Sequence, residues 1–116
     1  MSYDVDTEFQ GAEILSAFKD GLIQEALHLF RKYADNHSLA DISASSKWNW
    51  LHQILLSPST DKKKTALSVH YLIEKGIPIN AQDIYGMTPL HYALRSQNAD
   101  AAIALLEAGA DPNIAN

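Results

Sequence analysis

Apolar residues in the last third of the chain recur every three to four positions. Over residues 99–108 this spacing predicts a helix, and Gly109 directly after it is a good helix terminator. A shorter helix is predicted before it, because Thr88 offers a capping hydroxyl and Pro89 suits a first helical turn. Asn98, between the two helices, is expected to take left-handed backbone geometry. The apolar positions of this pair are Leu90, Ala93, Leu94, Ala102, Ile103, Leu105 and Leu106.

A second pair of helices is predicted near the amino terminus. Gly21 separates two apolar clusters, each with helical spacing. Polar residues occupy the remaining positions of both helices, as the end unit of a stacked protein requires where it meets water. Residues 8–41 are therefore predicted to be a helix pair that caps one end of the molecule. Its apolar positions are Ile14, Leu15, Ala17, Phe18, Leu22, Ile23, Ala26, Leu27, Leu29, Phe30 and Tyr33.

The chain also contains an internal repeat. Residues 72–81 (LIEKGIPINA) align with residues 105–114 (LLEAGADPNI) at an offset of 33, with Gly76 on Gly109. Further upstream, Leu51 and His52 align with Leu90 and His91 at an offset of 39. A fixed period of this length is the mark of a repeat protein.

The difference between the two offsets predicts an insertion of six residues in the earlier unit. Residues 57–64 (SPSTDKKK) accommodate it and are expected to form a solvent-exposed loop between two helices. The lysine run 62–64 is interpreted as a solvated loop tip, with a docking site for an acidic partner as the alternative.

Residues 83–93 (DIYGMTPLHYA) followed by residues 103–113 (IALLEAGADPN) resemble one nearly complete unit of the ankyrin-repeat family. Residues 45–81 resemble a degenerate unit, in which Asn49 and Trp50 stand where Thr and Pro are usual. The resemblance implies an all-α solenoid of about three helix–turn–helix units, joined by short β-turn or hairpin connections. The single domain 1–116 would then comprise the capping pair 8–41, the degenerate repeat 45–81 and the near-consensus repeat 82–116.

The resemblance also implies structural roles for the repeat motif. His91, and less directly His52, is expected to hydrogen-bond within and between the tight turns, whereas a catalytic role for His91 is the minor alternative. The structural motif residues are Gly86, Thr88, Pro89, Leu90, His91 and Gly109.

In this family the variable turn tips and the exposed sides of the first helices contact partner proteins. Tyr, Trp, Met and Arg are the residue types that anchor such interfaces. Trp48 has the core as an equal alternative, and Trp50 is expected in the core. The partner-binding residues implied by the resemblance are Trp48, Gln53, Ile84, Tyr85, Met87, Tyr92, Arg95 and Ser96, with Ser46 and Leu56 at matching places.

Composition narrows the choice of partner. The chain has 116 residues, 14 acidic against 9 basic, and a formal net charge of -5, which disfavours nucleic acid and anionic membrane surfaces and would attract a basic protein. Cysteine is absent, so disulfides and thiolate chemistry are excluded. The amino terminus has no secretory pattern and no apolar run is long enough to cross a bilayer, so a cytoplasmic location is expected.

Catalytic patterns are not found in the sequence. His28, His37 and His70 have no metal-ligand spacing, and the glycines are too dispersed for a phosphate-binding loop. No cofactor, metal site or enzymatic activity is predicted.

The expected function is therefore a non-enzymatic protein-interaction module that binds through its concave face and turn tips. Small members resembling this chain include inhibitors that neutralise a cognate toxin, which makes an immunity or inhibitor role the preferred one. A targeting or adaptor fragment of a larger protein is the alternative. The last predicted helix of the chain is followed by no polar capping unit before Asn116, so a truncated chain or a natural frayed end is expected, with a partner or second copy covering that edge as the alternative.

Overall fold

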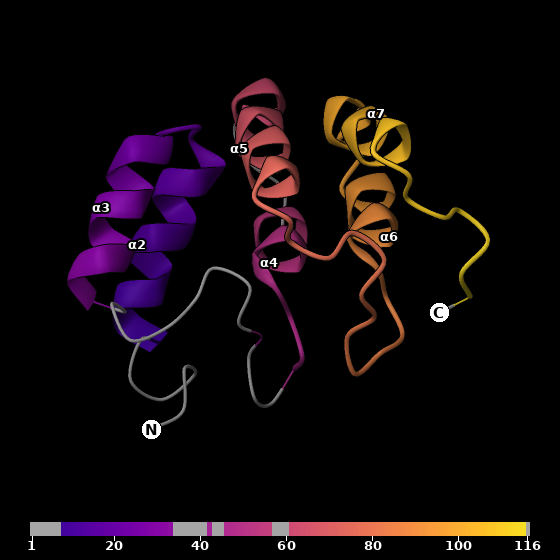
Figure 1. Cartoon of the computed structure of the whole chain (residues 1–116), viewed down its shortest axis with the longest axis horizontal. Coiled ribbons are helices and arrows are strands. Elements are labelled where there is room, and N and C mark those ends of the chain that lie inside the picture. The colour runs from indigo at the N-terminus through magenta and orange to yellow at the C-terminus, as the bar shows by residue number, and fades with distance from the viewer. Residues whose placement is uncertain (1–7, 34–41, 43–45, 57–60, 116) are drawn as a thin grey trace.

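Three antiparallel helix pairs lie side by side in the structure (Figure 1). The computed structural model describes residues 8–33, 42, 46–56 and 61–115. The pairs are α2 (Glu8–Lys19) with α3 (Ile23–Tyr33), α4 (Trp50–Leu56) with α5 (Lys62–Glu74), and α6 (Pro89–Arg95) with α7 (Ala99–Glu107). The described residues contain no strand, so the predicted all-α architecture of helix–turn–helix units is confirmed.

The core between the first two pairs is built around Trp50. Its side chain is buried at the start of α4, and its ring centroid lies 5.5 Å from that of Phe18 and 6.4 Å from that of Phe30. Tilted and edge-on ring pairs of this kind add to the stabilisation from burial alone. The tryptophan in the position usual for proline thus ties the degenerate unit to the amino-terminal pair, as expected for a core residue.

Buried hydroxyls complete the contact between α5 and α2. Thr65 Oγ1 donates to the carbonyl of Lys19 at 2.7 Å, and Ser68 Oγ donates to the carbonyl of Phe18 at 2.5 Å. Lys19 is the last residue of α2, and the last carbonyls of a helix have no partner within it, so the bond from Thr65 satisfies a group that packing would otherwise leave unpaired. The carbonyl of Phe18 also accepts the N–H of Gly21 at 3.0 Å. The two hydroxyl bonds explain why Thr65 and Ser68 are buried on an otherwise apolar face.

The last two pairs pack through small residues. The buried face of α7 consists mainly of Ala101, Ala102 and Ala104 with Leu105, and it contacts both α5 and α6. The apolar faces predicted for α6 and α7 were therefore too wide. Leu94 of α6 and Ile103 and Leu106 of α7 were expected to be buried, but their side chains are 59%, 54% and 44% exposed.

The helix beginning at Lys62 corrects the predicted loop over residues 57–64. Asp61 is the N-cap of α5, and its carboxylate accepts hydrogen bonds from the backbone N–H groups of Lys63 and Lys64 at 3.1 and 3.2 Å. An Asp cap satisfies donors that would be unpaired at a helix start, so the lysine run forms the first turn of α5 rather than a loop tip. Residues 57–60 lie outside the described residues.

The turn between α6 and α7 differs from the prediction in one residue. Gln97, not Asn98, has the left-handed backbone, with φ 60°, and Asn98 is instead the buried N-cap of α7. Gly21 occupies the matching place between α2 and α3, with φ 73°. In both turns the residue after the left-handed one donates its N–H to the carbonyl five positions earlier. Leu22 donates to Ala17 and Asn98 donates to Ala93, which is the Schellman motif.

Replacing Gln97 by Gly should raise the free energy of unfolding by about 1 kcal/mol, because left-handed geometry is costly for a residue with a Cβ. The hydrogen bonds that join Gln97 to Lys62 and Leu94 use the backbone atoms of Gln97, which glycine keeps. Urea unfolding of both proteins tests this. Gln24→Gly in the exposed first turn of α3 is the control and should lower stability by about 0.5–1 kcal/mol. A loss of stability in Gln97→Gly would contradict the assignment.

Candidate functional site

The turn that precedes α6 is closed by one carboxylate. Asp83 Oδ1 accepts hydrogen bonds from the N–H groups of Tyr85 and Met87, both at 2.9 Å. The backbone closes the same loop, since the N–H of Asp83 donates to the carbonyl of Met87 and the N–H of Gly86 donates to the carbonyl of Asp83, both at 3.0 Å. Gly86 has φ 77°, which a turn this tight requires. The tip is therefore held in one conformation.

The second carboxylate oxygen of Asp83 reaches two aromatic side chains. Trp48 donates its Nε1–H to Oδ2 at 2.9 Å, and the hydroxyl of Tyr92 donates to the same oxygen. Trp48 belongs to the middle unit and Tyr92 to α6, so one carboxylate joins two neighbouring units. Asp83 is buried, with 5% of its surface exposed, and all four donors are uncharged.

These contacts shift both ionisable groups. Burial acts to raise the pKa of the Asp83 carboxyl, but the hydrogen bonds from Tyr92, Met87, Trp48 and Tyr85 hold it below its usual value. Burial raises the pKa of the Tyr92 hydroxyl to about 12, and its hydrogen bond to Asp83 acts in the same direction. At neutral pH the pair is thus a carboxylate and a protonated phenol, which is a structural arrangement.

The neighbouring turns are also joined through the backbone and through His52. Ile84 donates its N–H to the carbonyl of Ser46 at 3.1 Å. His52 Nδ1 accepts from the N–H of Asn49 at 3.0 Å, so Nε2 carries the proton and lies 2.8 Å from the carbonyl of Ala81 and 3.1 Å from that of Met87. His52 is fully buried and connects the first turn of α4 to the following tip.

His91 repeats half of this arrangement in the last unit. Thr88 donates its N–H to His91 Nδ1 at 2.8 Å, and the N–H of His91 donates to Thr88 Oγ1 at 3.3 Å. Asn49 and His52 form the same reciprocal pair, since the N–H of His52 donates to Asn49 Oδ1 at 3.1 Å. Both histidines therefore cap helices. The reciprocal cap of the degenerate unit uses Asn where the last unit uses Thr.

Two of the residues expected to contact a partner are instead buried. Met87 is 8% exposed because its side chain packs in the core beneath the turn, and Tyr92 is 3% exposed because its hydroxyl reaches Asp83. Both were predicted as surface contacts from their positions in the repeat, and the exposure expected of them is wrong.

The remaining candidates divide by exposure. Ile84 and Tyr85 are 50% and 66% exposed at the tip, and Arg95 is exposed at the end of α6. Trp48, Gln53 and Ser96 are half-buried. The turn therefore exposes two large side chains, Ile84 and Tyr85, whereas Met87 and Tyr92, which were expected to contact a partner beside them, are buried.

Asp83 is the residue that the sequence reasoning missed. A signal was present, because an Asp three positions before a Gly in a predicted turn is typical of a side chain that bonds its own backbone. Its link to Trp48 and Tyr92 had no such signal, since these residues lie 35 positions before it and 9 after it.

Metal-binding clusters and membrane-spanning helices are both absent from residues 8–33, 42, 46–56 and 61–115. Among them, no group of three or more His, Asp or Glu side chains is arranged to hold a metal ion. No helix in the described ranges has the length and apolar character needed to cross a membrane.

Comparison with known proteins identifies similar repeats. The family model for ankyrin repeats (many copies) matches residues 62–106. Two ankyrin repeat proteins of Fowlpox virus (strain NVSL) are 46% identical over 48 residues and 52% identical over 46 residues, covering 41% and 39% of this chain. A transient receptor potential cation channel subfamily A member 1 homolog of Caenorhabditis elegans is 30% identical over 120 residues and covers the whole chain. The chain spans only 7%, 9% and 9% of the length of these three relatives.

Protonation of His52 should make the fold less stable in mild acid. Burial lowers the pKa of His52, although its bonds to the carbonyls of Ala81 and Met87 and the charge of Asp83 act the other way. The neutral imidazole therefore stabilises the fold above pH about 6.5, and this contribution is lost as the pH falls below that value, by up to about 1.4 kcal/mol per pH unit.

Urea unfolding between about pH 7 and pH 5 measures this slope. His52→Ala should remove most of it. An equal slope in wild type and His52→Ala would contradict the role given to His52.

Asp83→Asn should lower the free energy of unfolding by about 1–3 kcal/mol at neutral pH, because an amide cannot accept all four hydrogen bonds. The folded-state pKa of Asp83 is depressed, so its contribution is present above the unfolded pKa and disappears as the pH falls through the folded value. The difference in the free energy of unfolding between wild type and Asp83→Asn should therefore become smaller in acid. Asp111→Asn is the control, since Asp111 is exposed and its carboxylate accepts the N–H of Asn113. This substitution should change the free energy of unfolding by less than about 0.5 kcal/mol.

Proposed function

Because this chain carries ankyrin repeats, which form protein-interaction modules, we propose that it is a non-enzymatic module that binds a partner protein through the turn tip at Ile84 and Tyr85. The first helices α2, α4 and α6 supply the rest of the binding surface, as the concave side of a stacked repeat protein does.

The observation that carries the proposal is the exposure of Ile84 and Tyr85 on a locked turn. Tyr85 is 66% exposed, yet its own N–H is bonded to Asp83, so its backbone loses little freedom on binding. Tyrosine offers a large contact area with few rotatable bonds, and such residues dominate the binding energy of many interfaces. An exposed aromatic on a fixed backbone is therefore well suited to anchor a partner.

The surroundings of the tip suit a polar rim. Ser46 and Gln53 are half-buried in the middle unit, and Arg95 is exposed on α6. Trp48 keeps part of its surface accessible while its indole N–H is bonded to Asp83. Ser46 lies beside the tip, since its carbonyl accepts the N–H of Ile84, whereas Gln53 and Arg95 would extend the polar surface along α4 and α6, as the edge of a protein interface usually does.

Charge favours a basic partner. The formal net charge of the chain is -5, and long-range attraction by such a charge raises the rate at which an oppositely charged protein arrives. Binding should therefore weaken as the salt concentration rises.

Within this class, the preferred role is an inhibitor that covers the functional surface of its partner, for example a toxin neutralised in the cytoplasm. An adaptor that recruits its partner to a larger assembly is the alternative. Both roles use the same tip, and the identity of the captured protein distinguishes them, because inhibition requires loss of the activity of that protein in the complex.

The test is a pull-down from a lysate of the source cell with the wild-type chain and with the double variant Ile84→Ala, Tyr85→Ala. The variant should lose the partner, since removing two exposed anchors typically costs at least about tenfold in affinity. The control is the double variant Leu22→Ala, Leu106→Ala. It removes two leucine side chains that are 49% and 44% exposed and that lie far from this turn in the sequence. Equal capture by the Ile84/Tyr85 variant and the control would exclude the turn tip as the site.

A further inference from the structure

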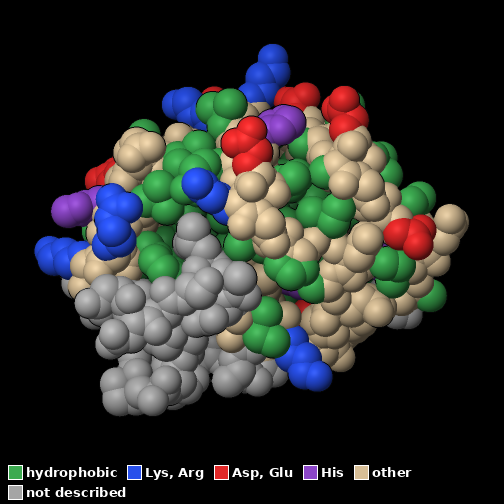
Figure 2. Space-filling view, in the orientation of Figure 1, with side chains coloured by type: hydrophobic (Ala, Val, Ile, Leu, Met, Phe, Trp, Pro, Cys, Tyr) green, Lys and Arg blue, Asp and Glu red, His purple; other side chains and the backbone are tan. Residues whose placement is uncertain are grey.

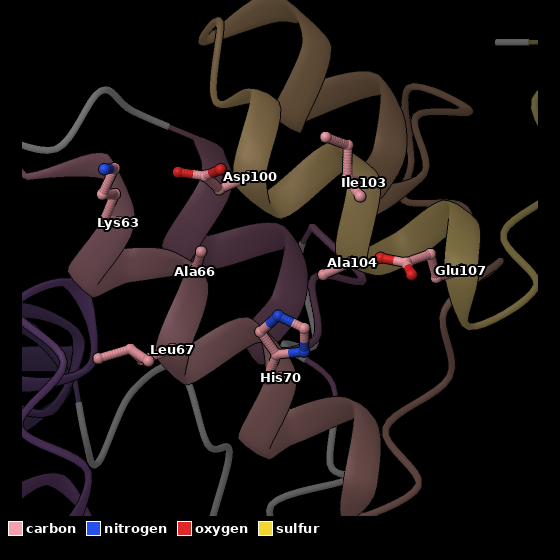
Figure 3. A pocket seen from close by; sticks show the side chains of 8 residues that line it. All are labelled: Lys63, Ala66, Leu67, His70, Asp100, Ile103, Ala104 and Glu107. Carbon is pink, nitrogen blue, oxygen red and sulfur yellow. The ribbon is translucent and has the colours of Figure 1, made fainter.

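A shallow groove of about 350 Å³ runs between α5 and α7, the second helices of the last two units (Figure 3). Each helix lines it with four residues at the same spacing, namely positions i, i+3, i+4 and i+7. They are Lys63, Ala66, Leu67 and His70 on α5, and Asp100, Ile103, Ala104 and Glu107 on α7. A stripe of this kind is the part of a helix that packs against another helix.

The two stripes run in the same direction. Lys62 Nζ donates to the carbonyl of Gln97 at 3.1 Å, and Asn98 Nδ2 donates to the carbonyl of Lys62 at 3.2 Å, so the amino-terminal ends of α5 and α7 lie together. Corresponding positions of the two stripes are all 37 residues apart. The groove thus has matching layers along its length, with charged or polar residues at both ends and apolar residues between them.

The middle of the groove has a small-residue floor and large apolar walls. Ala66 and Ala104 are 5% and 4% exposed and form the floor. Leu67 and Ile103 are 56% and 54% exposed and stand on either side. Figure 2 shows hydrophobic side chains reaching the surface over this part of the molecule among charged side chains. The walls are too open to enclose a small molecule, but a row of side chains from a helix would fit between them.

The two edges of the groove carry different charge. Lys63 and His70 lie on the α5 edge, and Asp100 and Glu107 lie on the α7 edge. Seven residues are two helical turns, so the two polar positions of each edge are about 10.5 Å apart along the helix. A helix bound in the groove would place side chains seven residues apart opposite the two polar positions of each edge.

We propose that this groove is a docking site for a short amphipathic helix of a partner protein. Its apolar residues would lie between Leu67 and Ile103, its basic residues along Asp100 and Glu107, and its acidic residues along Lys63 and His70. The site lies on the second helices of the units, whereas the tip at Ile84 and Tyr85 lies between the units before α6, so it is a second surface that does not depend on the function proposed above.

Three fluorescent helical peptides of about 18 residues, five turns each, test the proposal. All have leucine at the a and d positions of the heptad. One carries lysine along one edge and glutamate along the other, and two matched peptides carry lysine or glutamate along both edges. The mixed peptide should bind the intact chain most tightly, by about tenfold over each matched peptide, and its affinity should fall with salt. Equal binding of all three, or no binding of the mixed peptide, would overturn the proposal.

Protein variants then locate the peptide. Leu67→Ala, Ile103→Ala should weaken the mixed peptide about tenfold, whereas the control Leu22→Ala, Leu94→Ala, with 49% and 59% exposed leucines, should bind as wild type does. Asp100→Lys, Glu107→Lys makes both edges basic and should shift the preference to the glutamate peptide. The variant Ile84→Ala, Tyr85→Ala should bind the mixed peptide normally, which separates this site from the turn tip.

Sedimentation of the wild-type chain decides between a partner helix and a second copy of the chain. A monomer at the concentrations of the titration supports the proposal. A dimer that dissociates on Leu67→Ala, Ile103→Ala would show that the groove is covered by a second copy, and it would overturn the proposal.

Discussion

The carboxylate of Asp83 is the group on which the last two units depend. Burying a carboxylate is costly unless its oxygens are fully hydrogen-bonded, and here two backbone and two aromatic side-chain donors meet that requirement. The two backbone bonds close the turn, and the two side-chain bonds attach it to Trp48 and Tyr92. The position of Ile84 and Tyr85 on the surface follows from this, because both residues lie inside the loop that Asp83 closes.

A second set of bonds preserves the repeat geometry where its consensus residues are missing. Asn49 and His52 cap α4 with the same reciprocal bonds that Thr88 and His91 make in α6. Asn49 also donates its side-chain amide N–H to the carbonyl of Pro78 at 2.9 Å while its amide oxygen caps α4, so its two polar atoms serve two separate connections. Trp50 meanwhile fills the space against Phe18 and Phe30. The degenerate unit thus caps its first helix with the same hydrogen-bond geometry as the last unit, using different residues.

The second helices face a weaker constraint, because they pack through alanine. Ala66 and Ala104 allow α5 and α7 to approach closely, and the larger residues beside them remain at the surface. Leu67 and Ile103 are therefore exposed although each lies within an apolar helical pattern. A pattern of apolar residues indicates which positions can be buried, but burial also requires a neighbour on that side.

The sequence by itself determined the helix pairs, their order and the family resemblance. These features depend on local spacing, on glycine at helix ends and on capping residues, which act within a few positions of the chain. The exposed tip at Tyr85 was also predictable, since it flanks Gly86 in a predicted turn. The helical start at Lys62 and the left-handed Gln97 also depend on local bonds, from the Asp61 cap and from the turn after α6, but the sequence offered competing positions for both. The burial of Met87 and Tyr92 was decided by the tertiary structure. It depends on packed neighbours far along the chain, and for Tyr92 and Trp48 the common partner is a carboxylate that only folding brings between them.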